Sequence, residues 1–167
     1  MGLDMYLYAN KYDAKHTYGW EDEKRERTAK SFYPRALQKL ALMHSKENFL
    51  SKETFYQIGY WRKFNALHSF IVDNYSTNGE DDCRKIYLSL DNLNEILDTL
   101  KKVKANPGSA EYILPPRAGF FFGSTQIDEW YMRDIEYSIE LFEEVIAIVK
   151  RNDKRKNYYE IYYQASW

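Results

Sequence analysis

The chain has 167 residues, enough for one domain with a sizeable hydrophobic core. Its 24 Lys and Arg residues nearly balance 25 Asp and Glu residues, so the net charge of −1 argues against a dedicated nucleic-acid or membrane-surface binder. A single cysteine excludes an intramolecular disulfide and a cysteine-only metal site. We therefore expect a single domain over 1–167, without cofactor or membrane segment, in the cytoplasm.

Both ends of the sequence show the period-two alternation of β-strands. Residues 3–9 alternate Leu3, Met5 and Leu7 with Asp4 and tyrosines, and residues 158–163 read YYEIYY. Strands this rich in tyrosine can pair through their aromatic faces. We therefore predict that the two terminal strands lie in one sheet, adjacent or separated by one strand.

Between these strands, helical signals dominate. Residues 10–50 give weak signals: a charged run at 21–27 indicates a solvated helix turn or loop, and Pro34 fits the first turn of a helix. Ser51 resembles the N-cap of a long helix from about 52 to 75. The segment 78–82 is typical of a turn, and residues 85–89 favour a short strand.

The second half of the chain predicts two more helices. Ser89 or Asp91 caps a helix that the sequence Asn106-Pro107-Gly108 stops, and a last helix covers about 126–150 after a loop at 109–125. The apolar residues of this last helix follow helical spacing: Trp130, Ile135, Ile139, Phe142, Val145, Ile146 and Val149. The fold class is α+β, with three to four helices against a small, mainly antiparallel sheet that includes both terminal strands.

The helix expected at 52–75 carries the first candidate site residues. On a helical wheel, His68 lies centrally on an apolar face with Trp61 and Phe64, either as a core histidine or at the wall of a partly buried pocket. Arg62, Asn65, Ser69 and Asp73 form a polar stripe beside it, either a solvated edge or a site for phosphate or an amide. Lys63 points elsewhere on the wheel and is expected to be an ordinary surface residue.

The segment GFFFGST at 119–125 supplies the second group. Its Ser124 or Thr125 is a natural N-cap for the last helix, with Asp128 near the third helical position. The alternative is a pocket in which a phenylalanine stacks on a ligand and the helix N-terminus receives an anion, although Asp128 and Glu129 compete for that N-terminus. The full set of candidate ligand-binding residues is Arg62, Asn65, His68, Ser69, Phe121, Phe122, Ser124, Thr125 and Trp130.

Signatures of the common nucleotide-binding and hydrolytic enzymes are missing from the sequence. It contains no GxxxxGK[ST], GxGxxG, HExxH, CxxC or GxSxG pattern. Asp81-Asp82-Cys83 invites a nucleophile or metal interpretation, but adjacent carboxylates raise the pKa of a thiol, and a metal would need a third ligand such as His68. We therefore assign no catalytic residue and no metal ligand.

Four blocks of sequence resemble a family of small phage and prophage proteins. They are MGLDMYL at 1–7, YWRKxNxxH at 60–68, DDC at 81–83 and GFFFGSTxxDEWY at 119–131, within a resemblance that spans Met1 to about Leu141. The resemblance implies a phage or prophage origin and action in the cytoplasm of a bacterial host. It brings no settled activity, but such accessory proteins often counter host defence by capturing a nucleotide signal or blocking a defence protein.

Three hypotheses follow. The first is a phage-encoded binding protein that sequesters a small anionic, nucleotide-like defence signal. The second is an inhibitor that binds a bacterial defence enzyme through exposed Tyr and Trp. The third is an enzyme that cleaves a phosphoester or glycosidic bond with His68 and Asp81 or Asp82. Nucleic acid and membranes are not expected partners, whereas self-association as a homodimer is expected from the aromatic content and low net charge.

Overall fold

The computed structural model describes residues 2–16, 19–44, 49–153 and 158–167. They group into two compact units, of which the first combines Met1–Asn10 with Tyr56–Trp167 and the second is Lys11–Phe55. Strands β1 (Asp4–His16) and β2 (Phe49–Arg62) contribute residues to both units. The single domain expected over 1–167 stays a prediction.

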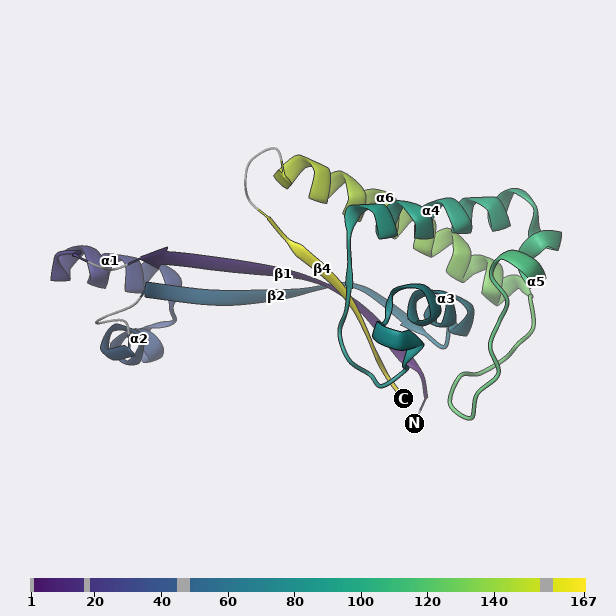
Figure 1. The fold of residues 1–167 in the computed structure, drawn as a ribbon, viewed down its shortest axis with the longest axis horizontal. Helices are drawn as coiled ribbons and strands as arrows, with labels where there is room; N and C mark the ends of the chain where they lie inside the picture. The colour runs from purple at the N-terminus through teal and green to yellow at the C-terminus, as the bar shows by residue number, and fades with distance from the viewer. Residues whose placement is uncertain (1, 17–18, 45–48, 154–157) are drawn as a thin grey trace. The chain divides into compact units, whose positions relative to one another are not determined.

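A four-stranded sheet in the order β2-β1-β4-β3 contains both terminal strands, as predicted (Figure 1). Strand β4 (Glu160–Ser166) pairs antiparallel with β1, from Asp4 opposite Ser166 to Asn10 opposite Glu160. Its other edge pairs antiparallel with the short β3 (Ile86–Leu88). The strand expected at 85–89 is therefore confirmed as well.

The alternation of side chains along β1 separates the core from a tyrosine face. Leu3, Met5 and Leu7 are fully buried, whereas Tyr8 on the opposite face stacks on Tyr162 of β4 with ring centroids 5.0 Å apart. Tyr8 and Tyr162 are direct partners in the strand register. The predicted pairing through aromatic faces is confirmed, because directly opposed rings on one face of a sheet lie within contact distance.

The helices of the first unit are α3 (Asn65–Tyr75), α4 (Leu90–Ala105), the short α5 (Ala110–Ile113) and α6 (Glu129–Asp153). Ser89 caps α4 as predicted, in a capping box with Asn92. Helices α4 and α6 lie side by side (Figure 1). The core lies between these helices and the inner face of the sheet.

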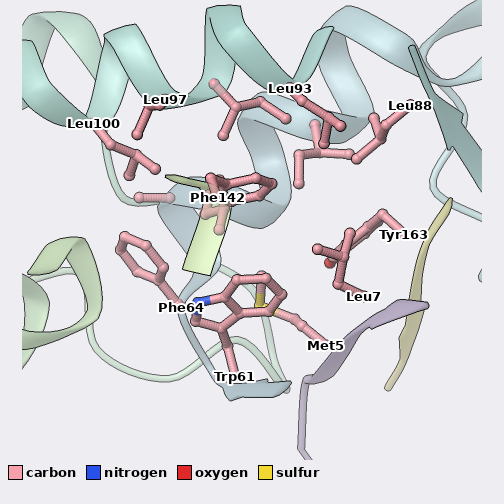
Figure 2. Close-up of a cluster of buried hydrophobic side chains, with 14 of the residues drawn as sticks. Met5, Leu7, Trp61, Phe64, Leu88, Leu93, Leu97, Leu100, Phe142 and Tyr163 are labelled. Atoms are coloured by element: carbon pink, nitrogen blue, oxygen red, sulfur yellow. The ribbon is translucent and has the colours of Figure 1, made fainter. Parts of the chain in front are cut away.

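Figure 2 shows how this core is filled. Leu93 and Leu100 of α4 point toward Phe142 of α6, and all three are fully buried. From the sheet side, Met5 and Trp61 complete the cluster. The Trp61 indole N–H donates to Ser138 Oγ at 2.8 Å, so the largest buried ring also has its polar atom satisfied.

The long helix expected at 52–75 is wrong. Residues up to Arg62 belong to β2, and α3 begins only at Asn65. The segment 54–61 is rich in β-branched and aromatic residues, which favour a strand. Lys63 has φ of 65°, a left-handed conformation that separates strand from helix. Trp61 and Arg62 therefore never lie on the helical wheel that the sequence indicated.

The expected start of the last helix is also wrong. Helix α6 begins at Glu129, and the Asp128 carboxylate accepts the backbone N–H groups of Trp130 and Tyr131 at 3.0 Å each. Asp128 is thus the N-cap, in place of Ser124 or Thr125. Trp130, expected in the apolar row, is 69% exposed, whereas the following members from Ile135 to Ile146 are buried as predicted.

The α+β class is confirmed, but the described residues contain six α-helices instead of three or four. The additional ones are α1 (Asp22–Phe32) of the second unit, where the sequence signal was weak, and the one-turn α5. Helix α2 (Gln38–His44) is the helix expected through ALQKLALM after Pro34. Pro34 precedes a 3₁₀ turn at Arg35–Leu37 that leads into α2. In the described segments, no helix has both the length and the apolar character needed to cross a membrane.

The second unit has a small core of its own. Ala29 of α1 and Leu50 of β2 are buried, and the Tyr33 hydroxyl is hydrogen-bonded to the backbone of Ser51. The ring of Phe32 also has the ammonium of Lys52 over it at 5.1 Å. The basic run at 150–156 falls partly outside the described residues.

Candidate functional site

A hydrogen-bonded chain leads from the protein core to the surface through the buried His68 on α3. Its Nδ1 lies 2.6 Å from the Tyr163 hydroxyl and its Nε2 lies 2.9 Å from Asp81 Oδ2. The other Asp81 oxygen accepts the indole N–H of Trp167 at 3.2 Å. Phe122 packs edge-on against the imidazole, with ring centroids 5.1 Å apart. Both His68 nitrogens are therefore occupied inside the protein.

The protonation states follow from the partners. Burial lowers the pKa of His68, although the Asp81 carboxylate acts in the opposite direction, so we take the ring as neutral at pH 7. Burial also raises the pKa of Tyr163 well above its ordinary value, which keeps its hydroxyl proton in place. Because a carboxylate only accepts, Nε2 carries the ring proton and Nδ1 accepts from Tyr163.

This cluster is a hydrogen-bonded network in which both His68 nitrogens have partners. The void beside His68, Asp81 and Cys83 has a volume of about 10 Å³, which is too small for a substrate. Asp82 is engaged by Arg84 at 2.8 Å, and Cys83 has φ of 62° in a tight turn. Within the described ranges, no three His, Cys, Asp or Glu side chains are placed to hold a metal ion together.

An open cavity of about 520 Å³ lies elsewhere in the first unit. One wall is a single face of α6, formed by Trp130, Arg133, Asp134 and Tyr137 at helical spacings of three, four and seven. The junction between β2 and α3 contributes Arg62 and Lys63 to the lining. Loop residues between 116 and 128 close one side. The volume is within the range of about 300–1,000 Å³ typical of small-molecule sites.

Two glycines let Lys63 lie at this junction. Its backbone N–H donates to the Leu3 carbonyl at 2.9 Å, which ties the left-handed residue to β1. A Cβ added at Gly2 would come within 2.9 Å of Lys63 Cε, and one at Gly123 within 3.0 Å of Lys63 Cδ. Gly123 also has φ of 88°, which glycine adopts most easily. The aliphatic part of the Lys63 side chain thus lies against Gly2 and Gly123, where any other side chain would collide with it.

Asn65 fixes the loop that closes the cavity. Its side-chain amide donates to the carbonyls of Phe122 at 2.9 Å and Ser124 at 2.8 Å, and its oxygen accepts the Arg117 backbone N–H at 3.1 Å. The Arg117 guanidinium forms a further ion pair with Asp73 at 3.0 Å. Because both amide ends of Asn65 are engaged, it shapes the cavity instead of reading a ligand.

Three cations line the cavity, and among the described residues one of them has neither an ion pair nor a ring contact. Arg62 pairs with Asp4 at 3.2 Å, and Arg133 lies over the Trp130 ring at 4.8 Å. In the described part of the chain, the Lys63 ammonium makes no hydrogen bond or ion pair. Burial, helped by Asp128, raises the pKa of the Asp134 carboxyl to about 6. A small anion with an aromatic part fits this combination of charge and ring surface.

The candidate residues named from the sequence separate into two groups. Arg62, Asn65, Ser124 and Trp130 line the cavity. His68, Ser69, Phe121, Phe122 and Thr125 do not. His68 and Ser69 are buried because α3 starts three residues after Arg62 and turns its inner face to the core. Phe122, from the loop, covers His68. His68 and Arg62 therefore line different cavities.

Lys63, Arg133, Asp134 and Tyr137 were missed from the sequence. The spacing of Trp130, Arg133, Asp134 and Tyr137 as one mixed polar and aromatic helical face could have indicated the α6 wall. Lys63 carried no such signal, since its position depends on a left-handed residue at an unexpected strand–helix junction.

Comparisons with protein-family models, with curated proteins and with solved structures give no match for this chain.

Proposed function

We propose that the chain binds a small anionic, nucleotide-like ligand in the cavity between α6 and the β2–α3 junction. The observation that supports it is the convergence of Arg62, Lys63 and Arg133 with the exposed Trp130 indole on one open cavity. Guanidinium and ammonium groups hold phosphate through charge-assisted hydrogen bonds, and an indole offers a stacking face.

The sequence blocks at 1–7, 60–68, 81–83 and 119–131 resemble phage and prophage proteins. In a phage protein, such binding would sequester the ligand. A sequestering protein removes a host defence signal by holding it, without converting it. The His68 network favours binding over turnover, since both imidazole nitrogens are engaged in the core. The proposal therefore includes no catalytic step.

Calorimetry with a panel of mononucleotides and cyclic nucleotides tests this function. Arg62→Ala and Lys63→Ala should each weaken the bound nucleotide about tenfold to a hundredfold, because each removes one charge-assisted contact. Lys102→Ala, on the exposed side of α4, is the matched control and should bind normally. This expectation replaces the sequence-based one, in which Lys63 was an ordinary surface residue.

Two outcomes would contradict the proposal. If no nucleotide of the panel binds, or if the Arg62 and Lys63 variants bind as well as the unchanged protein, the cavity is not the site. Chromatography of the same mixtures after several hours should recover the nucleotide unaltered. A product that accumulates in proportion to protein concentration would instead indicate an enzyme.

A second candidate function is inhibition of a protein partner, favoured by Phe120. This side chain is 96% exposed on the loop whose backbone Asn65 holds through Phe122 and Ser124. A rigid loop that presents a bare aromatic ring resembles a protein-binding hot spot. Phe120→Ser should abolish a complex with a defence enzyme while nucleotide binding persists, as measured by analytical ultracentrifugation of the mixed components.

A further inference from the structure

The cavity is lined by a partly buried carboxylate, that of Asp134. Within the described residues, the Asp134 side chain makes no hydrogen bond or ion pair, and Ser138 bonds to the Asp134 backbone carbonyl instead. Arg133 turns to Trp130, and Arg62 turns to Asp4. A partly buried carboxylate without a donor lacks the stabilisation that such groups normally have, so its two oxygens remain open to a ligand.

The position of Asp134 relative to Trp130 defines which part of a ligand it would meet. The two residues are four apart on α6, which places their side chains one helical turn apart on the same face. A flat ring that rests against the Trp130 indole can therefore bring one edge within reach of Asp134. The cations Arg62 and Lys63 line the same cavity from the β2–α3 junction, where they can hold a phosphate.

The chemistry of an ionised carboxylate selects the edge of that ring. A carboxylate is an acceptor only, and its two oxygens match two parallel N–H donors. Guanine offers such a pair at N1 and the exocyclic N2. Adenine presents a donor at N6 beside an acceptor at N1, and the acceptor lone pair would face the carboxylate. A site with a buried group left unpaired rejects the wrong ligand strongly.

We propose that the cavity is specific for guanine nucleotides, with Asp134 receiving the N1–H and N2–H edge of the base, Trp130 stacking on the ring, and Arg62 and Lys63 holding the phosphate. The proposal rests on the proposed function, because it assigns the base of the nucleotide that the cations hold.

Guanosine and adenosine 3′,5′-cyclic monophosphate are the probes, since each phosphodiester carries one negative charge from pH 5 to 8. Calorimetry at pH 7.5 should show at least a tenfold preference for the guanosine form. Asp134→Asn should reduce this preference to about twofold or less, because an amide offers one donor and one acceptor. The matched control, Asp98→Asn on the exposed face of α4, removes the same charge and should keep the preference.

A pH series provides an independent readout. A protonated Asp134 can donate to adenine N1 and accept from N6, so the preference for guanosine should shrink as the pH falls from 7.5 to 5. The titratable and charged groups that line the cavity with Asp134 are Asp128, Tyr131, Arg133 and Tyr137 at α6 and Arg62 and Lys63 at the β2–α3 junction. The Asp134→Asn variant should lack this pH dependence, which assigns it to Asp134 and not to these neighbours.

The outcomes separate the two proposals. Equal binding of both nucleotides, unchanged by Asp134→Asn, overturns guanine selection but keeps the anion site. A preference for the adenosine form, or a guanosine preference that survives Asp134→Asn, overturns the role of Asp134 in the same way. Failure of the unchanged protein to bind either probe or any other nucleotide of the panel overturns the proposed function itself.

Discussion

The His68 network and the α6 cavity contain similar residue types, but they differ in what is left unsatisfied. In the network, His68 bonds to both Tyr163 and Asp81, and the space that all three line is a void of about 10 Å³. In the cavity, Lys63 and Asp134 keep open capacity beside about 520 Å³. Residue type alone pointed to His68, whereas open bonding capacity next to volume points to the cavity.

The largest expected effect separates the two regions by stability. His68→Ala should lower the free energy of unfolding by about 3–5 kcal/mol, because it opens a cavity and leaves Tyr163 and Asp81 without their partner. Urea denaturation at pH 7 measures it. Ser124→Ala, on the exposed loop, should change the same quantity by less than about 0.5 kcal/mol. A loss below about 1 kcal/mol for His68→Ala would mean that the network is not structural.

Asn65 connects the two regions, since it lies on the same helix as His68 but fixes the wall of the cavity. Asn65→Ala should cost about 1–3 kcal/mol, because two carbonyls and one N–H of the loop lose their partner. Limited proteolysis should then cut faster between 117 and 124. Asn74→Ala is the matched control. Within the described residues, the Asn74 side chain donates to the Phe70 carbonyl of the same helix and to no loop residue. Equal cleavage of the two variants would refute the role of Asn65.

A smaller, stabilising effect is expected from the cavity carboxylate. The folded-state pKa of Asp134 is raised to about 6, so folding favours its protonated form and stability is lost as the pH rises from about 4 to 6. Asp134→Asn removes this penalty and should raise the free energy of unfolding by about 1 kcal/mol at pH 7.5, allowing for solvent screening. The gain should vanish near pH 3.5, and urea titrations at both pH values would show whether it does.

The smallest expected change in stability concerns Trp130. Because its indole is 69% exposed, Trp130→Ala should alter the free energy of unfolding by less than about 0.5 kcal/mol while weakening nucleotide binding about fivefold to tenfold. Trp61→Phe offers the contrast, since Trp61 is not among the residues that line the cavity and the change removes a buried hydrogen bond to Ser138. Thermal unfolding and calorimetry on both variants should therefore give opposite patterns.

Local patterns predicted those parts of the fold in which neighbouring residues carry the information. The alternation at 3–9 and in YYEIYY led to the β1–β4 pair, and Ser89 was one of two residues, with Asp91, expected to cap α4. The error at 52–62 has a physical cause. The aromatic residues Trp61 and Phe64 suit a helical wheel and a strand equally, and only the left-handed Lys63 decides where one ends.

The cavity was predictable in part for a related reason. Arg62 and Asn65 were selected as part of a polar stripe on an expected helix, and Ser124 and Trp130 from the segment around the start of the last helix. These four residues do line one cavity. His68 was selected by type, but its partner Tyr163 is 95 residues away, so no local pattern could show that its nitrogens are engaged. Long-range pairing of this kind becomes visible only in the folded chain.

The place of β4 between β1 and β3 has a consequence for biosynthesis. Asn10 and Glu160 pair across 150 residues, and a ribosome that adds about 5–20 residues per second needs on the order of ten seconds to bridge that interval. Until then one edge of β1 has no neighbour, and Leu3, Met5 and Leu7 lack most of the core that covers them. A nascent chain halted before Glu160 therefore exposes an unpaired edge of β1, and the sheet closes only after β4 has left the exit tunnel.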